Sequence, residues 1–418
     1  MNRPTDPASG GRAVTLPLPE AWPRYSEATA ARVQRRIQEG TVYAFGRERS
    51  VLELEDWARE YFQVEHALAV SSGTAALASA YAGLGIGPGD EVLVPTYTFH
   101  ASATPLFGLG ALPVLYDCDP VSARADIDDI AARISPATKA ICVTHMFGLP
   151  ADMDALMKLA DRHGIPVVED AAQAHGATVG GRKVATLGAV GCLSLGGQKM
   201  ISGGMGGLLL TNSADIHARA LLLGHAHERA QEELPATSRW SGPAETGHGQ
   251  NLRMHPLAAE LALDHCHSLD ERIATRTAVL TGLSERLARF GFLDPPRTPA
   301  GCSRGGWYGY KVVYRPEHAA GTDIDTFVGL LQAQGLKVAR PTTKPLHQTW
   351  PFQHHDIGLA GYDPQRRRPL YRDAELPHAT HLYGATLAFP DKNLHEPADA
   401  VLDQYVHGIE RVARRLGL

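Results

Sequence analysis

The feature that most limits the fold is an alternation of short apolar β-type runs and helical stretches between about residues 41 and 215. HALAV (66–70) leads through small residues into a helical stretch, and EVLVP (91–95) repeats the scheme. LPVLYDCD, KAICVTHMF and IPVVEDAA supply further apolar runs. This pattern predicts an α/β fold, a mostly parallel sheet sandwiched by helices. Ligands of such sheets bind at the carboxyl ends of the strands, so the residues that follow each strand matter most.

The flanking segments predict an arm and a second domain. Residues 26–40 form an amphipathic pattern that Ser26 can cap and Gly40 can end. Residues 254–291 read as one long helical stretch that bridges to a smaller α+β domain. We therefore expect an N-terminal arm and helix at 1–40, a large ligand-binding domain at 41–275 and a small C-terminal domain at 276–418.

Composition excludes several classes of function. The 418 residues carry a net charge of −5 and no Lys/Arg-rich run, so we expect no nucleic-acid partner. No apolar run approaches the roughly 18 residues of a membrane helix, and the N-terminal stretch lacks the apolar core of a signal peptide. Five scattered cysteines without a C-x-x-C pair predict a reduced, cytoplasmic protein without a metal site. The histidines of FQHHD (352–356) read as solvated.

Two strand ends hold candidate ligand-binding residues. Ser72, Gly73 and Thr74 follow the first strand and open a helix, where backbone N–H groups favour an anion such as phosphate. An ordinary N-cap is the alternative. Phe99 follows the next strand and can stack on a flat ring, although the residue taken alone favours a core aromatic.

A third strand ends in a carboxylate. Asp170 follows buried residues, and Gln173 comes one helical turn later. A buried carboxylate needs a cationic partner, which a protonated pyridine nitrogen would be, and Gln173 could then donate to a ring oxygen. The alternative is that Glu169 or Asp170 caps the next helix.

The run SLGGQKMISGGMGGLLLT (194–211) contains Lys199 as its single charged residue. An amine kept from water is nucleophilic and forms an imine with an aldehyde, and the glycines would let a flat group approach the backbone. A glycine-rich hairpin with a surface lysine is the alternative. The order of anion cradle, stacking aromatic, carboxylate and lysine matches the phosphate, ring face, ring nitrogen and aldehyde of pyridoxal 5′-phosphate.

These motifs resemble the DegT/DnrJ/EryC1/StrS family of pyridoxal phosphate-dependent, fold-type I aminotransferases, which act mostly on keto sugars and keto cyclitols. The resemblance covers nearly the whole chain and is carried by SSGTAAL, DEVLVPTYTFHASA, VVEDAAQAHGA, NLRMHPLAAELAL and KPLHQTW, among others. The leader GGRAVTLPLPEAWPRY is similar to that of the branch that makes aminocyclitols, antibiotic sugars and aminohydroxybenzoate.

The resemblance implies a role for each matching residue. It makes Lys199 the Schiff-base lysine and proton shuttle, and Asp170 the partner of the pyridinium nitrogen. It implies that Gln173 forms a hydrogen bond with the phenolic oxygen of the cofactor ring and that Phe99 stacks on the face of that ring. It further implies that the cofactor phosphate is bound by Ser72, Gly73, Thr74 and Ser194, and that Asn251 reaches the phosphate bound by the neighbouring subunit. Arg253 and His347 would contact the substrate.

Three positions depart from the family pattern S-F-H-x-x-K…G-E-G-G. Leu195 replaces the aromatic residue, Gly196 the histidine and Met205 the glutamate. The lost bulk and the lost carboxylate predict an altered substrate pocket, while the groups needed for the imine remain. Lys199 itself argues against the dehydrating relatives of the family, which have histidine at this position.

The sequence therefore predicts a homodimeric aminotransferase with shared active sites, which moves an amino group from glutamate or glutamine to a ketone on a sugar, cyclitol or related ring. Specialised metabolism is the expected context. Three alternatives stay open. One is an elimination, dehydration or cyclisation on the same cofactor, and another is a non-catalytic regulator, although no DNA-reading module is evident. The third is a Rossmann-type enzyme, which would need G-x-G-x-x-G after the first strand.

Overall fold

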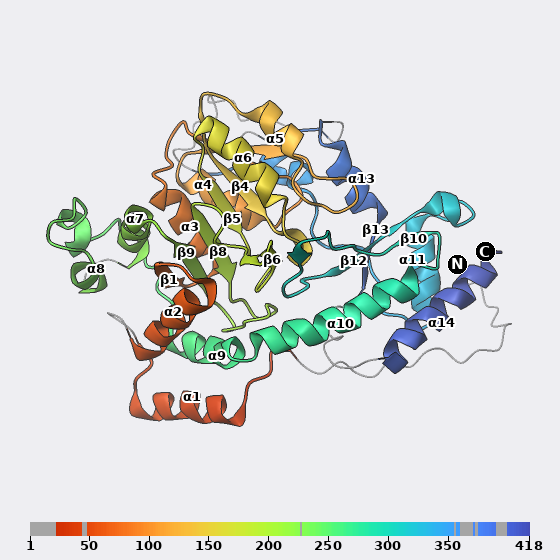
Figure 1. Cartoon of the computed structure of the whole chain (residues 1–418), viewed down its shortest axis with the longest axis horizontal. Coiled ribbons are helices and arrows are strands. Elements are labelled where there is room, and N and C mark those ends of the chain that lie inside the picture. The colour runs from red at the N-terminus through yellow and green to blue at the C-terminus, as the bar shows by residue number, and fades with distance from the viewer. Residues whose placement is uncertain are drawn as a thin grey trace.

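The centre of the protein is a seven-stranded sheet. The computed structural model describes residues 22–43, 48–225, 228–354, 357–359, 371–372, 375–389 and 399–418. The strand order is β1-β9-β8-β5-β4-β2-β3 (Figure 1). The strands are β1 (His66–Val70), β2 (Glu91–Pro95), β3 (Leu112–Tyr116), β4 (Thr138–Thr144), β5 (Val167–Asp170), β8 (Val190–Ser194) and β9 (Gly207–Thr211). Only β9 runs against its neighbours, which confirms the predicted mostly parallel sheet.

Helices cover both faces of this sheet. The helices around it are α2 (Arg49–Phe62), α3 (Gly73–Gly83), α4 (Thr104–Gly108), α5 (Ile127–Arg133), α6 (Met153–His163), α7 (Ala214–Gly224), α8 (Glu228–Glu233) and α9 (Pro256–Cys266). Leu68 and Val70 of β1 pack in a core cluster with α3 and α7. The alternate residues Ala67 and Ala69 pack in another cluster with α2 and α9. Because successive strand residues point to opposite faces, a strand buried on both sides is apolar throughout.

The N-terminal helix α1 (Glu27–Glu39) begins and ends where the sequence predicts. The Ser26 side chain accepts a hydrogen bond from the Thr29 N–H, and Gly40 closes the helix in the left-handed conformation at φ 71°. The Ser26 hydroxyl also donates to Asp264 at 2.6 Å, which ties α1 to α9.

The predicted helical stretch 254–291 is broken in two. Helix α9 ends at Cys266 and α10 (Leu269–Leu287) begins after Ser268. Helix α10 then runs from the large sheet to the smaller domain (Figure 1). The expected boundary between residues 275 and 276 falls inside α10, so the proposed division cuts a continuous helix.

The smaller domain has a core of its own. Its three-stranded antiparallel sheet consists of β10 (Leu293–Asp294), β12 (Tyr310–Tyr314) and β13 (Thr386–Phe389). Helices α10, α11 (Ile324–Ala333) and α14 (Asp399–Arg415) pack with this sheet in one cluster. A separate small sheet contains β6 (Thr178–Val179), β7 (Arg182–Lys183) and β11 (Cys302–Ser303).

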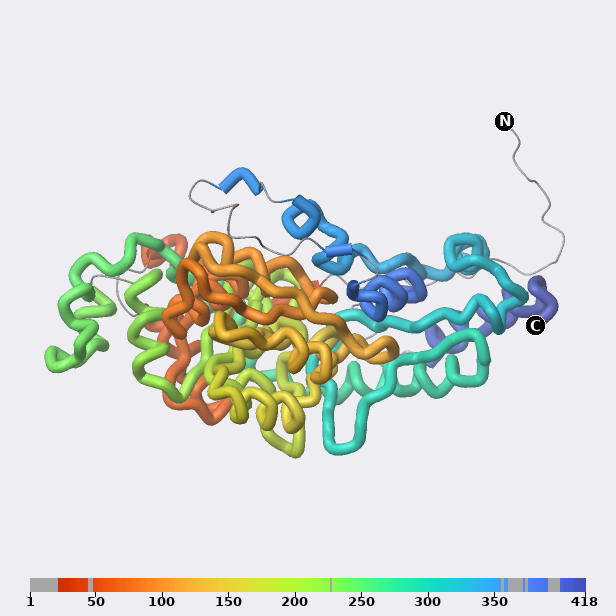
Figure 2. Tube along the Cα trace, turned by 90° about the horizontal axis from the view of Figure 1, so that it is seen from above, coloured from red at the N-terminus to blue at the C-terminus, as the bar shows by residue number. Residues whose placement is uncertain are grey.

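Part of the C-terminal region returns to the large domain, along its upper side in Figure 2. Leu346, Phe352, Tyr371 and Leu376 belong to the same core cluster as α3. Helices α12 (Trp350–Gln353) and α13 (Pro377–Ala385) lie in this region. The C-terminal segment therefore contributes to both cores.

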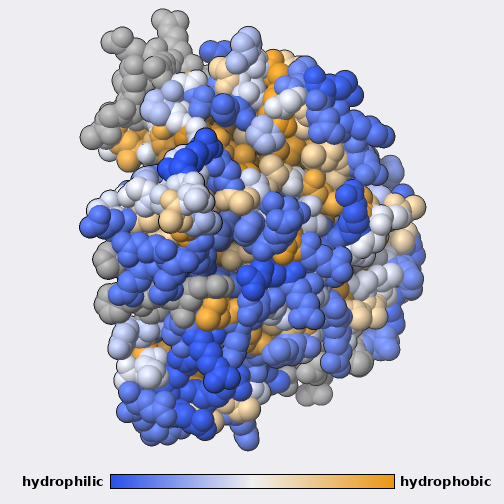
Figure 3. All heavy atoms as spheres, turned by 60° about the vertical axis from the view of Figure 1, so that its left-hand side comes forward, coloured by the Kyte–Doolittle hydropathy of each residue, from blue (hydrophilic) through white to orange (hydrophobic). Residues whose placement is uncertain are grey.

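The face in Figure 3 is mainly hydrophilic, with hydrophobic residues grouped between the hydrophilic parts. Among the described residues, no helix is long and apolar enough to cross a membrane. The FQHHD stretch lies partly outside the described residues, since His355 and Asp356 are not included.

Candidate active site

The carboxyl edge of the seven-stranded sheet gathers most of the predicted ligand-binding residues. Ser72 follows β1, Phe99 follows β2, and Asp170 and Ser194 are the last residues of β5 and β8. These four strands run in one direction, so their ends meet at the same edge. Open α/β sheets bind their ligands at such an edge.

Close packing joins the first turn of α3 to Ser194. Ser72 is the N-cap of α3, and its hydroxyl accepts from the Ala75 N–H at 3.0 Å. A Cβ built on Gly73 would lie 2.7 Å from the Ser194 Cβ, so this contact requires glycine. Thr74 is exposed in the same turn. The N-terminus of a helix with hydroxyls beside it forms an anion site, which fits the phosphate of pyridoxal phosphate.

Two successive carboxylates at the end of β5 point to opposite faces of the sheet. Glu169 accepts hydrogen bonds from the backbone N–H groups of Ala185, Leu187 and Gly188, at 2.6 to 2.9 Å. It also bonds His145 Nε2 at 3.0 Å. His145 Nδ1 accepts from a backbone N–H, so Nε2 carries the proton and donates to Glu169. Glu169 is therefore fully satisfied within the chain.

Asp170 has no such set of partners. Its side chain is 4% exposed, and it accepts from the Ser102 hydroxyl at 2.6 Å and from the Ala172 N–H at 3.1 Å. Within the described part of the chain, no lysine, arginine or histidine forms an ion pair with it. A buried carboxylate without a cation is costly. The environment of Asp170 thus fits a cationic ligand atom, as the pyridinium nitrogen of the cofactor would be.

Gln173 and Phe99, two further predicted cofactor contacts, lie in different environments. The Gln173 carbonyl oxygen accepts from the Phe147 N–H at 3.0 Å, so its amide N–H groups are the end that can donate to a ligand. Phe99 is 49% exposed and its ring contacts His100 at 4.1 Å between centroids. The Phe99 ring is therefore not a core aromatic.

Lys199 is partly buried, and its amine lies against an aromatic ring. The Nζ atom lies 3.7 Å from the centroid of the Tyr308 ring, which is a cation–π contact. Tyr308 comes from the segment between α10 and β12, more than a hundred residues after Lys199. The small domain therefore supplies one wall of the space around the amine.

Long-range hydrogen bonds anchor the backbone of the lysine loop. Trp22 Nε1 donates to the Lys199 carbonyl at 3.1 Å, and Arg272 donates to the Met200 carbonyl at 2.7 Å. His265 Nδ1 accepts from the Ser202 N–H at 3.0 Å. The backbone from which the Lys199 side chain extends is therefore fixed by three separate segments.

Two glycines of this loop have a structural cause that the sequence did not indicate. A Cβ on Gly203 would lie 2.5 Å from the Ala258 carbonyl oxygen in α9. Gly206 has φ 151°, and a Cβ there would lie 2.7 Å from the Met254 side chain. These two positions require glycine because the loop packs against α9, which is a reason independent of any flat ligand.

His175 is a buried neutral imidazole beside the lysine loop. Burial, and then the positive charge of Lys199, lower the pKa of His175 to about 3. Its Nε2 atom is buried and has no hydrogen-bond partner among the described residues. A neutral ring here adds no positive charge next to the amine.

Asn251 and Arg253 lie together at the start of the segment before α9. Asn251 is exposed and accepts from Arg253 Nε at 2.9 Å. The intervening Leu252 carbonyl accepts from the Ser71 N–H at 2.6 Å, so this segment runs beside the turn before α3. The exposed Asn251 side chain is compatible with the predicted contact to a second subunit, which stays a prediction.

His347 lies in the core rather than in an open site. It is 0% exposed, its Nδ1 atom is 2.7 Å from the Thr96 hydroxyl, and its Nε2 atom is 2.9 Å from the Thr380 hydroxyl. With both ring nitrogens occupied and no exposed surface, the predicted direct contact of His347 with a substrate has no geometric support in this conformation.

The positions that depart from the family pattern differ in exposure. Leu195 is fully buried, whereas Met205 is 66% exposed at the surface of the lysine loop. Gly196 is partly buried, and its N–H points to the Ser194 hydroxyl at 3.4 Å. The missing histidine and glutamate therefore leave space and an apolar side chain at the surface of the loop.

Three residues of the site were missed by the sequence reasoning. Ser102 donates to Asp170, Tyr308 contacts Lys199, and His175 lies beside both Lys199 and Ser194. Ser102 belongs to the stretch DEVLVPTYTFHASA, Tyr308 to GWYGYKVVYR and His175 to VVEDAAQAHGA. The pattern gave no reason to single them out, because their partners are distant in sequence.

Comparisons with known proteins agree with this geometry. The model of the DegT/DnrJ/EryC1/StrS aminotransferase family matches residues 23–388. GDP-perosamine synthase of Caulobacter vibrioides is 37% identical over 306 residues, which are 73% of this chain and 79% of that protein. L-glutamine:2-deoxy-scyllo-inosose aminotransferase of Streptoalloteichus tenebrarius is 35% identical over 340 residues, 80% of this chain and 79% of that protein.

A solved structure gives the same answer for the fold. The aminotransferase from Psychrobacter cryohalolentis superimposes with a TM-score of 0.83 at 26% identity, covering 96% of this chain and 100% of that chain. The aminotransferases of this family are pyridoxal phosphate-dependent enzymes of fold type I, which is the architecture of the seven-stranded sheet and its helices. This chain belongs to the DegT/DnrJ/EryC1/StrS aminotransferase family.

Proposed function

We propose that this protein is a homodimeric, cytoplasmic enzyme that uses pyridoxal phosphate to move an amino group from glutamate or glutamine to a ketone on a sugar, cyclitol or related ring. The observation that carries the proposal is Asp170, a buried carboxylate without a cationic partner among the described residues, at the same sheet edge as Lys199. The relatives named above, a perosamine synthase and a glutamine-dependent inosose aminotransferase, support a ring ketone as the acceptor.

Different residues at the carboxyl edge of the sheet would bind different parts of the cofactor. Ser72, Gly73, Thr74 and Ser194 would bind its phosphate, and Phe99 its ring face. Asp170 would pair with its nitrogen, and the Gln173 amide would donate to its phenolic oxygen. When bound, pyridoxal phosphate supplies an aldehyde for covalent attachment and an electron sink for the reacting carbon.

Lys199 has the central chemical role. Its Nζ atom would hold the cofactor covalently, then take the proton from the α-carbon of the amino donor. The hydrogen bonds of Trp22, Arg272 and His265 to the surrounding backbone fix the loop that carries this lysine. His175, whose ring stays neutral, avoids a second positive charge beside Nζ.

A second subunit would complete the site. Phe99 and Met205 are large apolar side chains that stay exposed at the site of a single chain. Asn251 is exposed as well, with Arg253 bonded to it, and would reach the phosphate of the neighbouring subunit. The homodimer, the role of Asn251 and the substrate role of Arg253 are parts of the proposal.

A spectroscopic experiment tests the proposal. The protein is loaded with pyridoxal phosphate, and L-glutamine and L-glutamate are added separately while the absorbance of the lysine-bound cofactor is followed. We expect one donor to bleach the band and a ring ketone, such as a keto cyclitol, to restore it. A band that neither donor bleaches would refute transamination.

A second candidate is an elimination or dehydration on the same cofactor. It is favoured by one observation, namely that exposed Met205 stands where the family has glutamate. In that case the ring substrate would lose water or another leaving group without gaining nitrogen. Mass analysis of the ring product separates the two reactions.

A further inference from the structure

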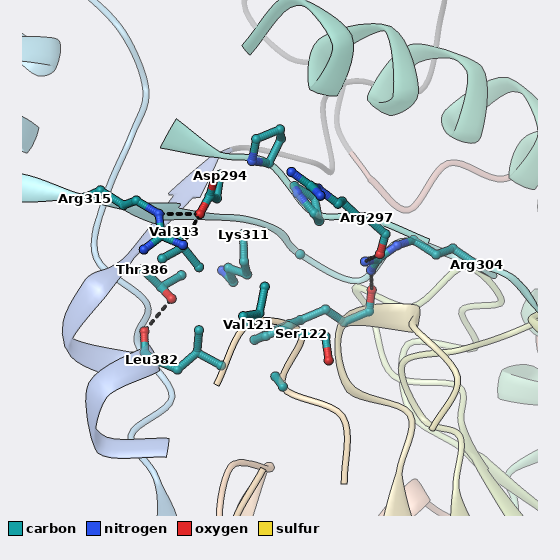
Figure 4. Close-up of a pocket in the computed structure, with 15 residues that line it drawn as sticks. Val121, Ser122, Asp294, Arg297, Arg304, Lys311, Val313, Arg315, Leu382 and Thr386 are labelled. Atoms are coloured by element: carbon teal, nitrogen blue, oxygen red, sulfur yellow. Dashed lines mark hydrogen bonds and ion pairs between the residues drawn. The ribbon is translucent and has the colours of Figure 1, made fainter. Parts of the chain in front are cut away.

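A cavity of about 270 Å³ lies between the large domain and the small domain, outside the set of cofactor-side residues (Figure 4). Lys199, Asp170 and Gln173 do not line it. Phe147 lines the cavity, and its backbone N–H donates to the Gln173 side chain. The lining residues are Val121, Ser122, Ala123, Phe147, Asp294, Pro295, Pro296, Arg297, Arg304, Gly309, Lys311, Val313, Arg315, Leu382 and Thr386.

The charges that line this interdomain cavity are strongly unequal. Four of the lining residues are cationic and one is acidic. Arg315 is already paired, because its guanidinium lies 2.5 Å from the Asp294 carboxylate and 3.8 Å from that of Glu317. The lining also contains Arg297, Arg304 and Lys311, and the Lys311 Nζ atom lies 5.7 Å from the centroid of the Phe147 ring. Figure 4 shows Lys311 between Arg315 and Arg297, directed into the space.

Arg304 is the most unusual of these cations. It is 6% exposed, and its guanidinium donates to the Thr298 hydroxyl and to the backbone carbonyls of Phe147 and Arg297. No carboxylate in the described part of the chain pairs with it. Burial lowers the pKa of Arg304 to about 10, so it remains charged at neutral pH. Neutral acceptors satisfy its N–H groups, and its Cζ atom lies 4.7 Å from the centroid of the Trp307 ring, but no acidic side chain in the described part of the chain balances its charge.

Apolar side chains line the interdomain cavity together with these cations. Val121, Val313, Leu382 and the adjacent prolines line the same cavity. Cations that act across a wall of low dielectric attract an anion more strongly than they would in water. The apolar surface adds contacts that a bare inorganic ion would not use.

We propose that the interdomain cavity binds a small organic oxyanion, a phosphate monoester or a carboxylate on a short carbon skeleton. Lys311 and Arg297 supply cationic groups at the cavity, and the buried Arg304 supplies a charge that its hydrogen bonds hold in place. This site is separate from the proposed transamination chemistry, and its occupancy is measured without turnover.

The test uses the holoenzyme, so that bound cofactor already fills the phosphate site at α3. Binding of glycerol 3-phosphate and of glutarate is measured separately by isothermal titration calorimetry at low and at moderate salt. The first probe reports a phosphate ligand and the second a carboxylate ligand. Lys311→Gln and Arg297→Gln are the test variants, and Lys139→Gln at the exposed start of β4 is the charge-matched control.

We expect one probe to bind with a dissociation constant in the millimolar range or below, and Lys311→Gln to weaken it about tenfold. Arg297→Gln, at an exposed position, should weaken the same probe without any effect on folding. Lys139→Gln should leave the affinity unchanged. The proposal is overturned if neither probe binds, if binding survives both test variants, or if the control variant weakens it equally.

Discussion

Two buried charges of opposite sign lack a counter-ion among the described residues, and their settings differ. Asp170 ends a central strand and receives a hydroxyl and a backbone N–H, whereas Arg304 lies between the domains and donates to a hydroxyl and two carbonyls. Both are hydrogen-bonded, so neither charge is explained by a missing polar contact. What each lacks is an opposite charge, and a ligand is the simplest source of one.

The neighbour of Asp170 shows what a structural carboxylate looks like. Glu169 has three backbone N–H donors and His145, and these bonds are made whether or not a cofactor is present. Glu169 is satisfied within the chain and maintains the fold, whereas we attribute a ligand-binding role to Asp170 and Arg304, which have no counter-ion among the described residues.

The largest loss of activity is expected from a change of Lys199, which lies at the same sheet edge as Asp170. Lys199→Ala removes both the covalent anchor and the proton-transferring amine, and it should lower transamination by roughly 10³-fold or more. The absorbance band of lysine-bound cofactor should be absent as well. Wild-type absorbance in the variant would show that another residue holds the cofactor. The site formed by Asp170 and Lys199 would then not be the active site.

The next effect separates the two carboxylates by activity. Asp170→Asn keeps the shape of the side chain and removes its charge, so turnover should fall by about 100-fold or more. Because the native charge is uncompensated in the chain, the apoprotein should unfold at the same temperature or a higher one. A large drop in the unfolding temperature of the apoprotein would place Asp170 with the structural carboxylates.

The matched change at the neighbouring position should have the reverse pattern. Glu169→Gln weakens charge-assisted bonds to three backbone N–H groups, and it should lower the free energy of unfolding by about 2–4 kcal/mol. Urea titration of the apoprotein measures this difference. If the cofactor-free protein is unaffected, the distinction drawn between the two carboxylates is wrong.

The smallest effect concerns pH. His175 has a pKa of about 3 in the folded chain and about 6.5 when unfolded, so between these values the unfolded chain binds the proton. Stability is therefore lost as the pH falls below about 6.5. His175→Gln should reduce the loss of unfolding free energy between pH 7 and pH 5 by about 2 kcal/mol. An equal loss in both proteins, measured by urea unfolding, would contradict a buried neutral His175.

The sequence predicts much of the fold and the cofactor side of the site, for a physical reason. Strand ends of a parallel sheet share one edge, so the order Ser72, Phe99, Asp170 and Ser194 along the chain already implies that they lie together. The ends of α1 are predictable too, since Ser26 and Gly40 act locally.

Contacts between distant segments could not be predicted in this way. Ser102 and Asp170 are 68 residues apart, and Arg304 and Phe147 are 157 apart. The break between α9 and α10 falls at His267 and Ser268, where neither proline nor glycine marks it. The burial of His347 could not be predicted either, because its partners Thr96 and Thr380 are visible only in three dimensions.

The central claim is that the site formed by Asp170 and Lys199 at the carboxyl edge of the large sheet catalyses transamination of a ring ketone. The direct measurement is the stoichiometry of a reaction with one amino donor and one ketone, with Lys199→Ala protein as the control. The account predicts one keto acid released for every ring amine formed, and neither product with the variant. Keto acid without ring amine, or a ring product that loses water and gains no nitrogen, would contradict it.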